Sequence, residues 1–349
     1  IIYTIYSEKH FLHATDNIFV QGAPFISREI PARARVICAA VERAKLGPIL
    51  TPTDHGLDPI LAIHKADFVE YLQMAYSWNV AWHGTPEPVL VARSSVTAQR
   101  ASRRPQDIAS LQEYYTFDYE DPILEHTWEA AYWSAQCALT AADLISKGER
   151  VVYALCRPPG HHATADQYGG FCYLNNVAIA ARHLQHNEAT VAILDLDYHH
   201  GNGTQAIFYT DPTVLFCSLH ADPDLDYPFF WGRVTERGSG SGLGYNYNWP
   251  LPLGIDDAYY CNVLEDALAV IADFAPHYLF VSLGLDIAED DPIGKFNITT
   301  AGLHEIGRRI ASLQLPTVIV QEGGYQLETL GNNVLAFLRA FQNLSLIHI

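Results

Sequence analysis

The stretch ILDLDYHHGNG, residues 193–203, places two aspartates and two histidines directly behind an apolar run. A short, unbroken run of branched apolar residues is typical of a strand buried on both faces, as in a parallel sheet covered by helices. Titratable side chains are costly at the end of such a strand unless they find partners there. The stretch therefore predicts an α/β protein with a polar site at the edge of its sheet.

Other runs of the same kind occur along the chain: RVVYALC (150–156), TVLFCSL (213–219), YLFVSLGL (278–285) and PTVIVQEG (316–323). Before and between them lie segments with a helical pattern, at 29–46, 126–147, 172–186, 256–275 and 299–313. Strands that alternate with helices indicate a parallel sheet with helices on both faces. We expect one domain over residues 1–349, because no repeat and no long linker divides the chain.

The chain has 349 residues and a formal net charge of −18, from 21 basic and 39 acidic residues. This balance argues against nucleic acid or an anionic membrane as the main partner and favours a small cationic substrate. No apolar stretch approaches the ~20 residues of a membrane span, and the first residues do not resemble a signal peptide. The six cysteines are widely spaced, which predicts reduced thiols and a cytoplasmic location.

Residues 77–125 do not follow the regular pattern. They contain an arginine cluster (Arg93, Arg100, Arg103 and Arg104), and an acidic stretch, FDYEDPILEHTWE, begins at residue 117. Two solvated charge runs would account for this composition. A long loop inside a compact domain is nevertheless usually functional or an interface. The alternative hypothesis is that this excursion reaches a second subunit, with its basic and acidic halves meeting across a two-fold axis.

Segments with reactive side chains follow four of the predicted strands: RPPGHHATADQYGGF (157–171), DLDYHHGNG (195–203), LDIAEDDP (285–292) and EGGY (322–325). In parallel α/β sheets the ligand site forms beyond the carboxyl ends of the strands. We therefore expect these segments to converge on one crevice. Their convergence is stronger evidence than any single motif.

A metal site is the first chemistry that these segments suggest. Asp197 and His199 are two residues apart on an extended segment, so their side chains point the same way. Asp286, behind another strand, would add a second carboxylate. Two oxygens, one nitrogen and an open position are typical of a catalytic zinc or iron(II) ion. For Asp197, His199 and Asp286 alone, the alternative is a polar strand end whose side chains are hydrogen-bonded within the protein.

Acid–base catalysis is the second kind of chemistry that these segments suggest. His161 and His162 cannot both face one way in a strand, so a loop must present them, and imidazoles titrate near neutral pH. Asp195 is well placed to orient one of the two rings. Tyr325 follows two glycines, and its hydroxyl can stabilise an oxyanion. The alternative interpretation is that Tyr325 only packs at the start of a helix.

The glycine-rich segment RGSGSGLGYNYNWP, residues 237–250, invites comparison with a phosphate-binding loop. It lacks the G-K-[ST] continuation, and its glycines miss the G-x-G-x-x-G spacing. We expect a flexible rim or a close-packed turn instead. A C-x-x-C zinc site and a G-x-S-x-G serine nucleophile are also absent from the sequence.

Taken together, these residues resemble the arginase–deacetylase superfamily, and within it the acetylpolyamine amidohydrolases, relatives of the histone deacetylases. The resemblance covers nearly the whole chain and is carried by YSEKHFLHA, RPPGHHA, GGFCYLNNVAIAA, LDLDYHHGNGTQAIFY, SLHADP, VSLGLD and QEGGY. It implies a single α/β domain of the arginase–deacetylase fold, with an eight-stranded parallel sheet. It also implies hydrolysis of N-acetylated polyamines or related small acetylated amines.

The resemblance assigns roles to the site residues. Zinc, or Fe²⁺ or Co²⁺ in its place, is held by Asp197, His199 and Asp286. His162 is the general base and then acid, His161 is its electrostatic partner bonded to Asp195, and Tyr325 binds the oxyanion. Asn202 stands where many histone deacetylases have an aspartate. A neutral partner there should leave His162 less basic.

Ion and substrate sites are further implications of the resemblance. Two structural potassium sites are implied, the first at Asp195, Asp197, His199, Ser218 and Leu219, and the second at Phe208, Asp211, Val214 and Tyr245. The implied substrate-binding residues are Glu120, Gly170, Phe171, Tyr227 and Gly324. The 77–125 excursion resembles a loop that narrows the cleft in a homodimer. Ala109 stands where another acid occurs in the family, which leaves the preferred polyamine length open.

Other functions are weighed against this one. The first alternative is a deacetylase of acetyl-lysine side chains in proteins, which a wide, open entrance would favour. A ureohydrolase of the arginase type would need two manganese ions and more aspartate ligands than we find. A binding module without catalysis should lack a metal ligand, the histidine pair or the tyrosine, and all of these are present.

Overall fold

The computed structural model describes residues 1–349 except 21, 91–103, 186–188 and 343–349. Its centre is an eight-stranded sheet in the order β4-β1-β5-β10-β9-β6-β7-β8, in which all neighbours are parallel. The strands are β1 (Tyr3–Ile5), β4 (Ile49–Leu50), β5 (Val151–Ala154), β6 (Val191–Asp195), β7 (Val214–Ala221), β8 (Asn246–Leu251), β9 (Tyr278–Leu283) and β10 (Thr317–Gln321). A small antiparallel pair, β2 (Phe19–Val20) and β3 (Ala23–Pro24), lies apart from this sheet.

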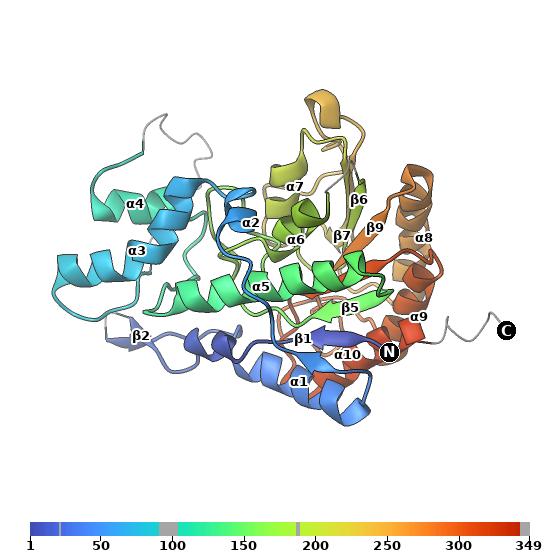
Figure 1. Ribbon diagram of the computed structural model, residues 1–349, viewed down its shortest axis with the longest axis horizontal. Helices are drawn as coiled ribbons and strands as arrows, with labels where there is room; N and C mark the ends of the chain where they lie inside the picture. The colour runs from blue at the N-terminus through green and yellow to red at the C-terminus, as the bar shows by residue number, and fades with distance from the viewer. Residues whose placement is uncertain (21, 91–103, 186–188, 343–349) are drawn as a thin grey trace.

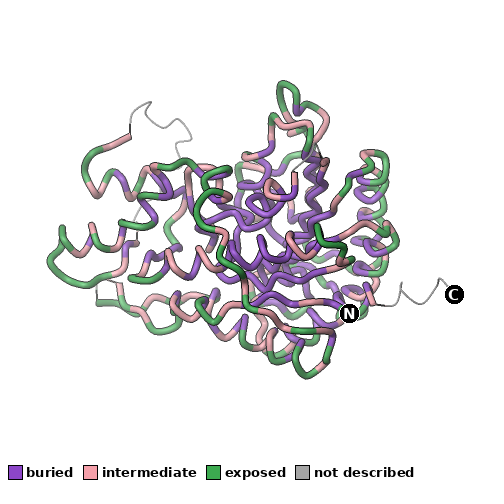
Figure 2. The backbone as a smooth tube through the Cα atoms, in the orientation of Figure 1, coloured by how far each residue is buried: buried purple, intermediate pink, exposed green. Residues whose placement is uncertain are grey.

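Side chains of the central strands alternate between two hydrophobic cores. On β6, Val191 and Ile193 pack into one core, whereas Ala192 and Leu194 pack into the other. Successive residues of a strand point to opposite faces, so a strand that is apolar throughout must be covered on both sides. Figure 2 shows the result, with buried chain through the centre and exposed chain at the periphery.

Helices cover both faces (Figure 1). One core is completed by α1 (Ala32–Ala44), α8 (Asp257–Phe274), α9 (Thr300–Ala311) and α10 (Leu327–Gln342). The other is completed by α2 (Asp58–Leu61), α3 (Ala66–His83), α4 (Ile108–Tyr115), α5 (Thr127–Ser146), α6 (Asn176–Leu184) and α7 (Asn202–Phe208). The predicted single α/β domain with an eight-stranded parallel sheet is confirmed.

Local signals explain where several helices begin and end. The side chains of Asn175, Asp256 and Thr299 each accept a hydrogen bond from a backbone N–H in the first turn of α6, α8 and α9. Helix α5 ends at Ser146 with Lys147 as its C-cap, and Gly148 adopts φ 105°, a conformation that glycine allows after a helix end. The five strands and five helices expected from periodicity are present, with slightly different bounds.

The expectation for residues 237–250 is wrong in its second half, because residues from Asn246 onward form strand β8. Its inward side chains are polar: Asn246 and Asn248 both donate hydrogen bonds to Gln205 Oε1. Since no apolar run marks this strand, pairing with β7 defines it rather than its composition. The short strands β1 and β4 escaped sequence analysis for a related reason, since they are too brief to show a period.

The 77–125 segment is less irregular than its composition suggests. Helix α3 continues to His83, and α4 occupies Ile108–Tyr115, so the loop expectation is wrong there. Arg104 Nη2 lies 3.2 Å from Glu70 Oε2, and the Arg104 guanidinium lies over the Tyr115 ring. Both contacts are made within the same chain. Arg93, Arg100 and Arg103 lie outside the described residues. Helices α3 and α4 lie together at one end of the molecule (Figure 1).

Two further expectations concern the whole chain. All six cysteines are unpaired, and five of them are buried. Among the helices in the described residues, none combines the length and the apolar character that a membrane span requires.

Candidate active site

One cavity of about 440 Å³ opens at the carboxyl ends of the strands. Its wall includes His161 and His162 after β5, His199 after β6, Tyr227 after β7, and Tyr325 after β10. The segments that the sequence predicts to converge thus do so. Parallel strands end at the same edge of the sheet, which brings residues more than 160 positions apart into one wall.

The predicted metal ligands lie together, and His199 among them belongs to the wall of this cavity. His199 Nδ1 is 3.2 Å from Asp197 Oδ1 and 3.1 Å from Asp286 Oδ2. One ligand atom from each of the three residues lies within 4.8 Å of the other two. Their mutual distances therefore suit three donors to one ion.

Backbone contacts fix both carboxylates. Asp197 Oδ2 accepts a hydrogen bond from Gly323 N at 2.8 Å, and Asp286 Oδ1 accepts one from Tyr198 N at 3.0 Å. A Cβ atom at residue 323 would lie 2.6 Å from the Oδ2 atoms of Asp197 and Asp286. Glycine is required here because any side chain would fill the space between the two carboxylates.

The charge of this cluster fits a divalent cation. Asp197 and Asp286 are completely buried, and Asp286 Oδ2 has no hydrogen-bond partner among the described residues. Burial and the neighbouring charge of Asp197 raise the pKa of Asp286 above its ordinary range. A buried carboxylate oxygen without a donor is costly unless a cation compensates it. The oxygen–oxygen–nitrogen donor set matches zinc or another divalent transition metal.

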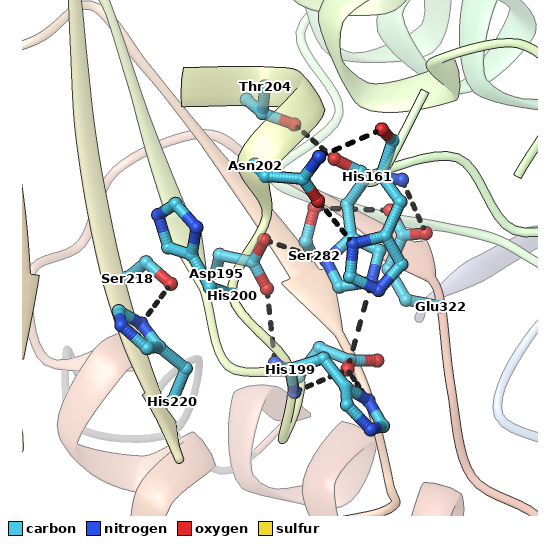
Figure 3. Close-up of polar contacts among 12 residues, drawn as sticks. His161, Asp195, His199, His200, Asn202, Thr204, Ser218, His220, Ser282 and Glu322 are labelled. Atoms are coloured by element: carbon cyan, nitrogen blue, oxygen red, sulfur yellow. Dashed lines mark hydrogen bonds and ion pairs between the residues drawn. The ribbon is translucent and has the colours of Figure 1, made fainter. Parts of the chain in front are cut away.

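The two adjacent histidines, of which Figure 3 labels His161, differ in their partners. His161 Nδ1 lies 3.0 Å from Asp195 Oδ2, and His162 Nδ1 lies 2.6 Å from Asn202 Oδ1. Burial alone would lower the pKa of His161, but the carboxylates of Asp195 and Asp197 outweigh it and raise the pKa to about 10. Burial and repulsion by His161 and His199 hold the pKa of His162 well below its ordinary value. The surroundings therefore make His161 the more basic ring of the pair and His162 the less basic one.

Glu322 is a buried member of the site that sequence reasoning missed. Its Oε2 accepts hydrogen bonds from Gly160 N at 2.7 Å and His161 N at 3.2 Å, and Ser282 Oγ lies 3.2 Å from Oε1 (Figure 3). Burial raises the pKa of Glu322 to about 7. This side chain fixes the loop that carries the histidine pair. Its signal in the sequence is only its place before the two glycines.

Tyr325 is held in the cavity wall by groups that do not involve its hydroxyl. Its backbone N–H donates to Asp291 Oδ2 at 2.6 Å, and the Arg33 guanidinium lies 4.6 Å from its ring centre. Arg33 also donates to the carbonyl oxygens of Glu322 and Gly324. Burial raises the pKa of the Tyr325 phenol well above its usual value, so the group remains a hydrogen-bond donor.

Phe171 and Tyr227 line the cavity as predicted, and two aspartates position them. Phe171 adopts φ 66°, a conformation that costs a non-glycine residue energy, and its N–H donates to Asp121 Oδ1. Asp118 Oδ2 accepts from the Tyr227 hydroxyl at 2.8 Å and from Gly170 N at 2.7 Å. Sequence reasoning missed the roles of Asp118 and Asp121, although both belong to the acidic stretch that it singled out.

The other predicted substrate residues have different outcomes. Glu120 is exposed and Gly170 partly buried, and both contribute to the cavity wall. Gly324 is not among the wall residues, and its carbonyl instead binds Arg33. Ala109 lies on helix α4, away from the cavity wall.

The residues of the expected potassium sites form two groups. Asp195, the last residue of β6, pairs in register with Ser218 within β7, and Leu219 follows Ser218. Phe208, Asp211 and Val214 lie where α7 leads into β7, with Asp211 N bonded to the Phe208 carbonyl oxygen. Tyr245 directly precedes β8, and its carbonyl oxygen accepts a hydrogen bond from Phe216 N on β7. The Asp211 carboxylate is bound by Arg182 at 2.7 Å.

The chain is similar to known proteins over nearly its whole length. Residues 27–341 match the family described as histone deacetylase domain. Acetylpolyamine amidohydrolase 1 of Pseudomonas aeruginosa is 42% identical over 341 residues, which cover 97% of this chain and 98% of that protein. A crystal structure of an acetylpolyamine aminohydrolase from Burkholderia pseudomallei superimposes with a TM-score of 0.91 at 41% identity, covering 99% of both chains. The HDA15 HD domain superimposes less closely, with a TM-score of 0.80 at 26% identity over 98% of this chain and 88% of that one.

Proposed function

The chain belongs to the histone deacetylase domain family, and from this premise we propose that it removes acetyl groups from N-acetylated polyamines or related small acetylated amines. The products are acetate and the free amine. The observation that carries the proposal is the meeting of Asp197, His199 and Asp286 with His162 and Tyr325 around one cavity. The substrate class is supported by curated relatives named as acetylpolyamine amidohydrolases at 39–42% identity.

We propose zinc as the catalytic ion, with Fe²⁺ or Co²⁺ as substitutes, held by Asp197, His199 and Asp286. When bound, such an ion polarises the acetyl carbonyl and brings the pKa of water toward ~7. Structural potassium ions are proposed at the two groups of residues described above. The charged cluster of ligands and the unbonded Asp286 oxygen support the metal proposal.

The histidine pair supplies the proton transfers. Asn202 Oδ1 accepts the hydrogen of His162 Nδ1, because the amide nitrogen of Asn202 faces the His162 carbonyl oxygen. The lone pair of His162 Nε2 is then available to take a proton from the attacking water. His161 lies beside it, with ring centres 4.0 Å apart, and its contact with Asp195 favours the protonated ring, which stabilises negative charge that develops in the cavity.

Tyr325 and His162 complete the reaction. Water oxygen bonds to the acetyl carbon, and the Tyr325 hydroxyl donates a hydrogen bond to the oxyanion that forms. His162 then returns its proton to the amine nitrogen as the carbon–nitrogen bond breaks. Acetate and a protonated amine leave the cavity.

Charge and shape at the mouth support a small cationic substrate. Glu120 and Asp118 line the entrance, and aromatic side chains form much of the wall. Carboxylates at the mouth can pair with a distal ammonium group, while the aromatic wall holds the alkyl chain. The net charge of −18 favours approach of such cations.

A substrate panel tests the proposal. With acetylputrescine, acetylcadaverine, acetylspermidine and acetyl-lysine peptides, we expect kcat/KM to be at least ~10-fold higher for the small amines, because one good ionic contact is worth ~1.4 kcal/mol or more. Glu120→Gln should raise KM for the polyamines with little change in kcat, and Glu125→Gln, on the neighbouring surface, serves as its control. Faster turnover of the peptides would favour the alternative, a protein lysine deacetylase.

We also propose a homodimer in which the 77–125 excursion contacts the second copy and narrows the cleft. Exposed Trp82 and Tyr119 on this segment support the proposal, since large aromatic side chains are common in interfaces. Gel filtration at low and high salt should give a dimer in at least the low-salt buffer. Elution as a monomer in both would rule the dimer out.

A cytoplasmic location is proposed from the thiols. Six cysteines without a disulfide are typical of a protein in a reducing compartment. The test is to count free thiols in protein purified in air without a reductant. If all six remain free, the thiols do not depend on a reducing compartment, and the argument for a cytoplasmic location fails.

A further inference from the structure

A second cluster of metal-binding side chains lies outside the cavity. His55 precedes α2, Asp143 is on α5 and His183 is on α6, and none of them belongs to the wall of the active-site cavity. One ligand atom from each of the three lies within 4.8 Å of the other two. The three come from segments up to 128 positions apart, so the fold alone assembles the group.

Both imidazole rings point Nε2 at the same carboxylate. His55 Nε2 is 3.0 Å from Asp143 Oδ2, and His183 Nε2 is 2.9 Å from Asp143 Oδ1. The two ring centres are 5.5 Å apart and nearly perpendicular. Zinc bonds of about 2.0–2.2 Å place tetrahedral donors roughly 3.4 Å from one another, so small shifts would seat an ion among these atoms.

The tautomer of His55 leaves a place for a cation. Its Nδ1 lies 3.0 Å from both the Thr53 carbonyl oxygen and Gln136 Oε1. The Gln136 amide is oriented by its own contacts, because Oε1 accepts from His55 N and Nε2 donates to the Gly56 carbonyl. Both neighbours of Nδ1 are therefore acceptors, and Nδ1 carries the hydrogen. The Nε2 atom then faces a carboxylate oxygen, and the contact is favourable when a proton or a metal ion lies between the two atoms.

The surroundings of His55 resemble the support that metal-binding histidines receive. Such a ring usually donates its second N–H to a carbonyl or carboxylate, which fixes its orientation. On α5, Gln136, Thr140 and Asp143 lie on one face and bind successive parts of the 53–56 segment. The ligand side chains are 11% (His55), 31% (Asp143) and 21% (His183) exposed, so an ion can enter and keep a water ligand.

We propose that His55, Asp143 and His183 form a second, peripheral site for a divalent transition cation such as Zn²⁺. Two imidazoles, one carboxylate and an open position constitute a donor set that zinc, cobalt or nickel accepts and that calcium or magnesium does not. A bound ion would join the 53–56 segment to α5 and α6. It would stabilise that junction without taking part in the reaction in the cavity.

Equilibrium dialysis against buffered free Zn²⁺, with metal content measured by mass spectrometry, tests the site. Full-length wild-type protein should bind one zinc more than the His183→Gln and Asp143→Asn variants. Their affinity for this second equivalent should fall by at least the ~10–100-fold that loss of a supporting residue costs at other metal sites. His83→Gln, an exposed histidine at the end of α3, is the control and should bind as the wild type does.

Thermal melting and kinetics complete the test. Added Zn²⁺ should raise the melting temperature of the wild type more than that of His183→Gln, and kcat/KM should be unchanged in every folded variant of this site. Failure of the active-site proposal would be seen in the metal content and activity of Asp286→Asn, not in the variants of the second site. The two proposals can therefore fail separately. The proposal is overturned if wild type and both variants bind equal zinc, or if His55 and His183 simply share a proton with Asp143 and no second equivalent binds.

Discussion

An Asp286→Asn variant is expected to lose the catalytic metal and nearly all hydrolysis. The substituted amide can keep the hydrogen bond from Tyr198 N through its carbonyl oxygen, so the local backbone should persist. The atom replaced is the Oδ2 that has no hydrogen-bond partner among the described residues, and a neutral amide there is a far poorer metal ligand. Since the metal contributes several kcal/mol to transition-state stabilisation, the loss in kcat/KM should be at least ~10³-fold.

Metal content at a fixed free-zinc concentration and kcat/KM measure this effect together. Asp266→Asn, an exposed aspartate on α8, is the matched control and should retain both metal and activity. The metal-free variant should melt no lower than the metal-free wild type, because burial and Asp197 already disfavour the charged form of Asp286. Full zinc content with wild-type rates would show that Asp286 is not a ligand.

A Tyr325→Phe variant is expected to keep its metal but to lose ~10²–10³-fold in kcat, the usual cost of one oxyanion donor. The ring should stay in place, since Arg33 stacks on its face and Asp291 accepts from the backbone N–H. Neither contact uses the hydroxyl. The change therefore removes one hydrogen bond to the oxyanion and little else.

Steady-state kinetics with acetylputrescine and metal analysis should separate kcat from KM and from metal loss. KM should change little, because the hydroxyl acts on charge that develops only in the transition state. Tyr259→Phe, at an exposed position on α8 outside the cavity wall, provides a control for the loss of a tyrosine hydroxyl. A near-wild-type kcat in Tyr325→Phe would mean that another group holds the oxyanion.

Several features of the site could be anticipated because they are local in sequence. The two-residue period of an extended segment predicts that Asp197 and His199 face one way. In the structure residues 197–199 form a bend after β6, and the two side chains still meet because His199 N donates to Asp197 Oδ1. The apolar runs before the reactive segments identified the strands, and the parallel arrangement then required the segments to meet. Asp286, His161 and Tyr325 followed from that rule and not from their own neighbours in sequence.

Other features escaped because their partners are remote. Arg33 donates to carbonyl oxygens 289 and 291 residues away, and nothing near residue 33 indicates it. Asp118 and Asp121 were read as part of a charged loop, whereas they bind the backbone of Gly170 and Phe171. The polar strand β8 and helix α4 were hidden for the same reason, since their place depends on what they pack against.

The sequence by itself determined the layered α/β architecture, the edge of the sheet at which the cavity forms, and the types of polar side chain gathered there. These properties depend on periodicity and on residue type, which act over a few neighbouring positions. Tertiary structure alone decided which groups support the site, which of the two adjacent histidines is the more basic, and that His55, Asp143 and His183 meet on another surface. Such properties depend on burial and on charge–charge distance, and both arise only when distant segments pack together.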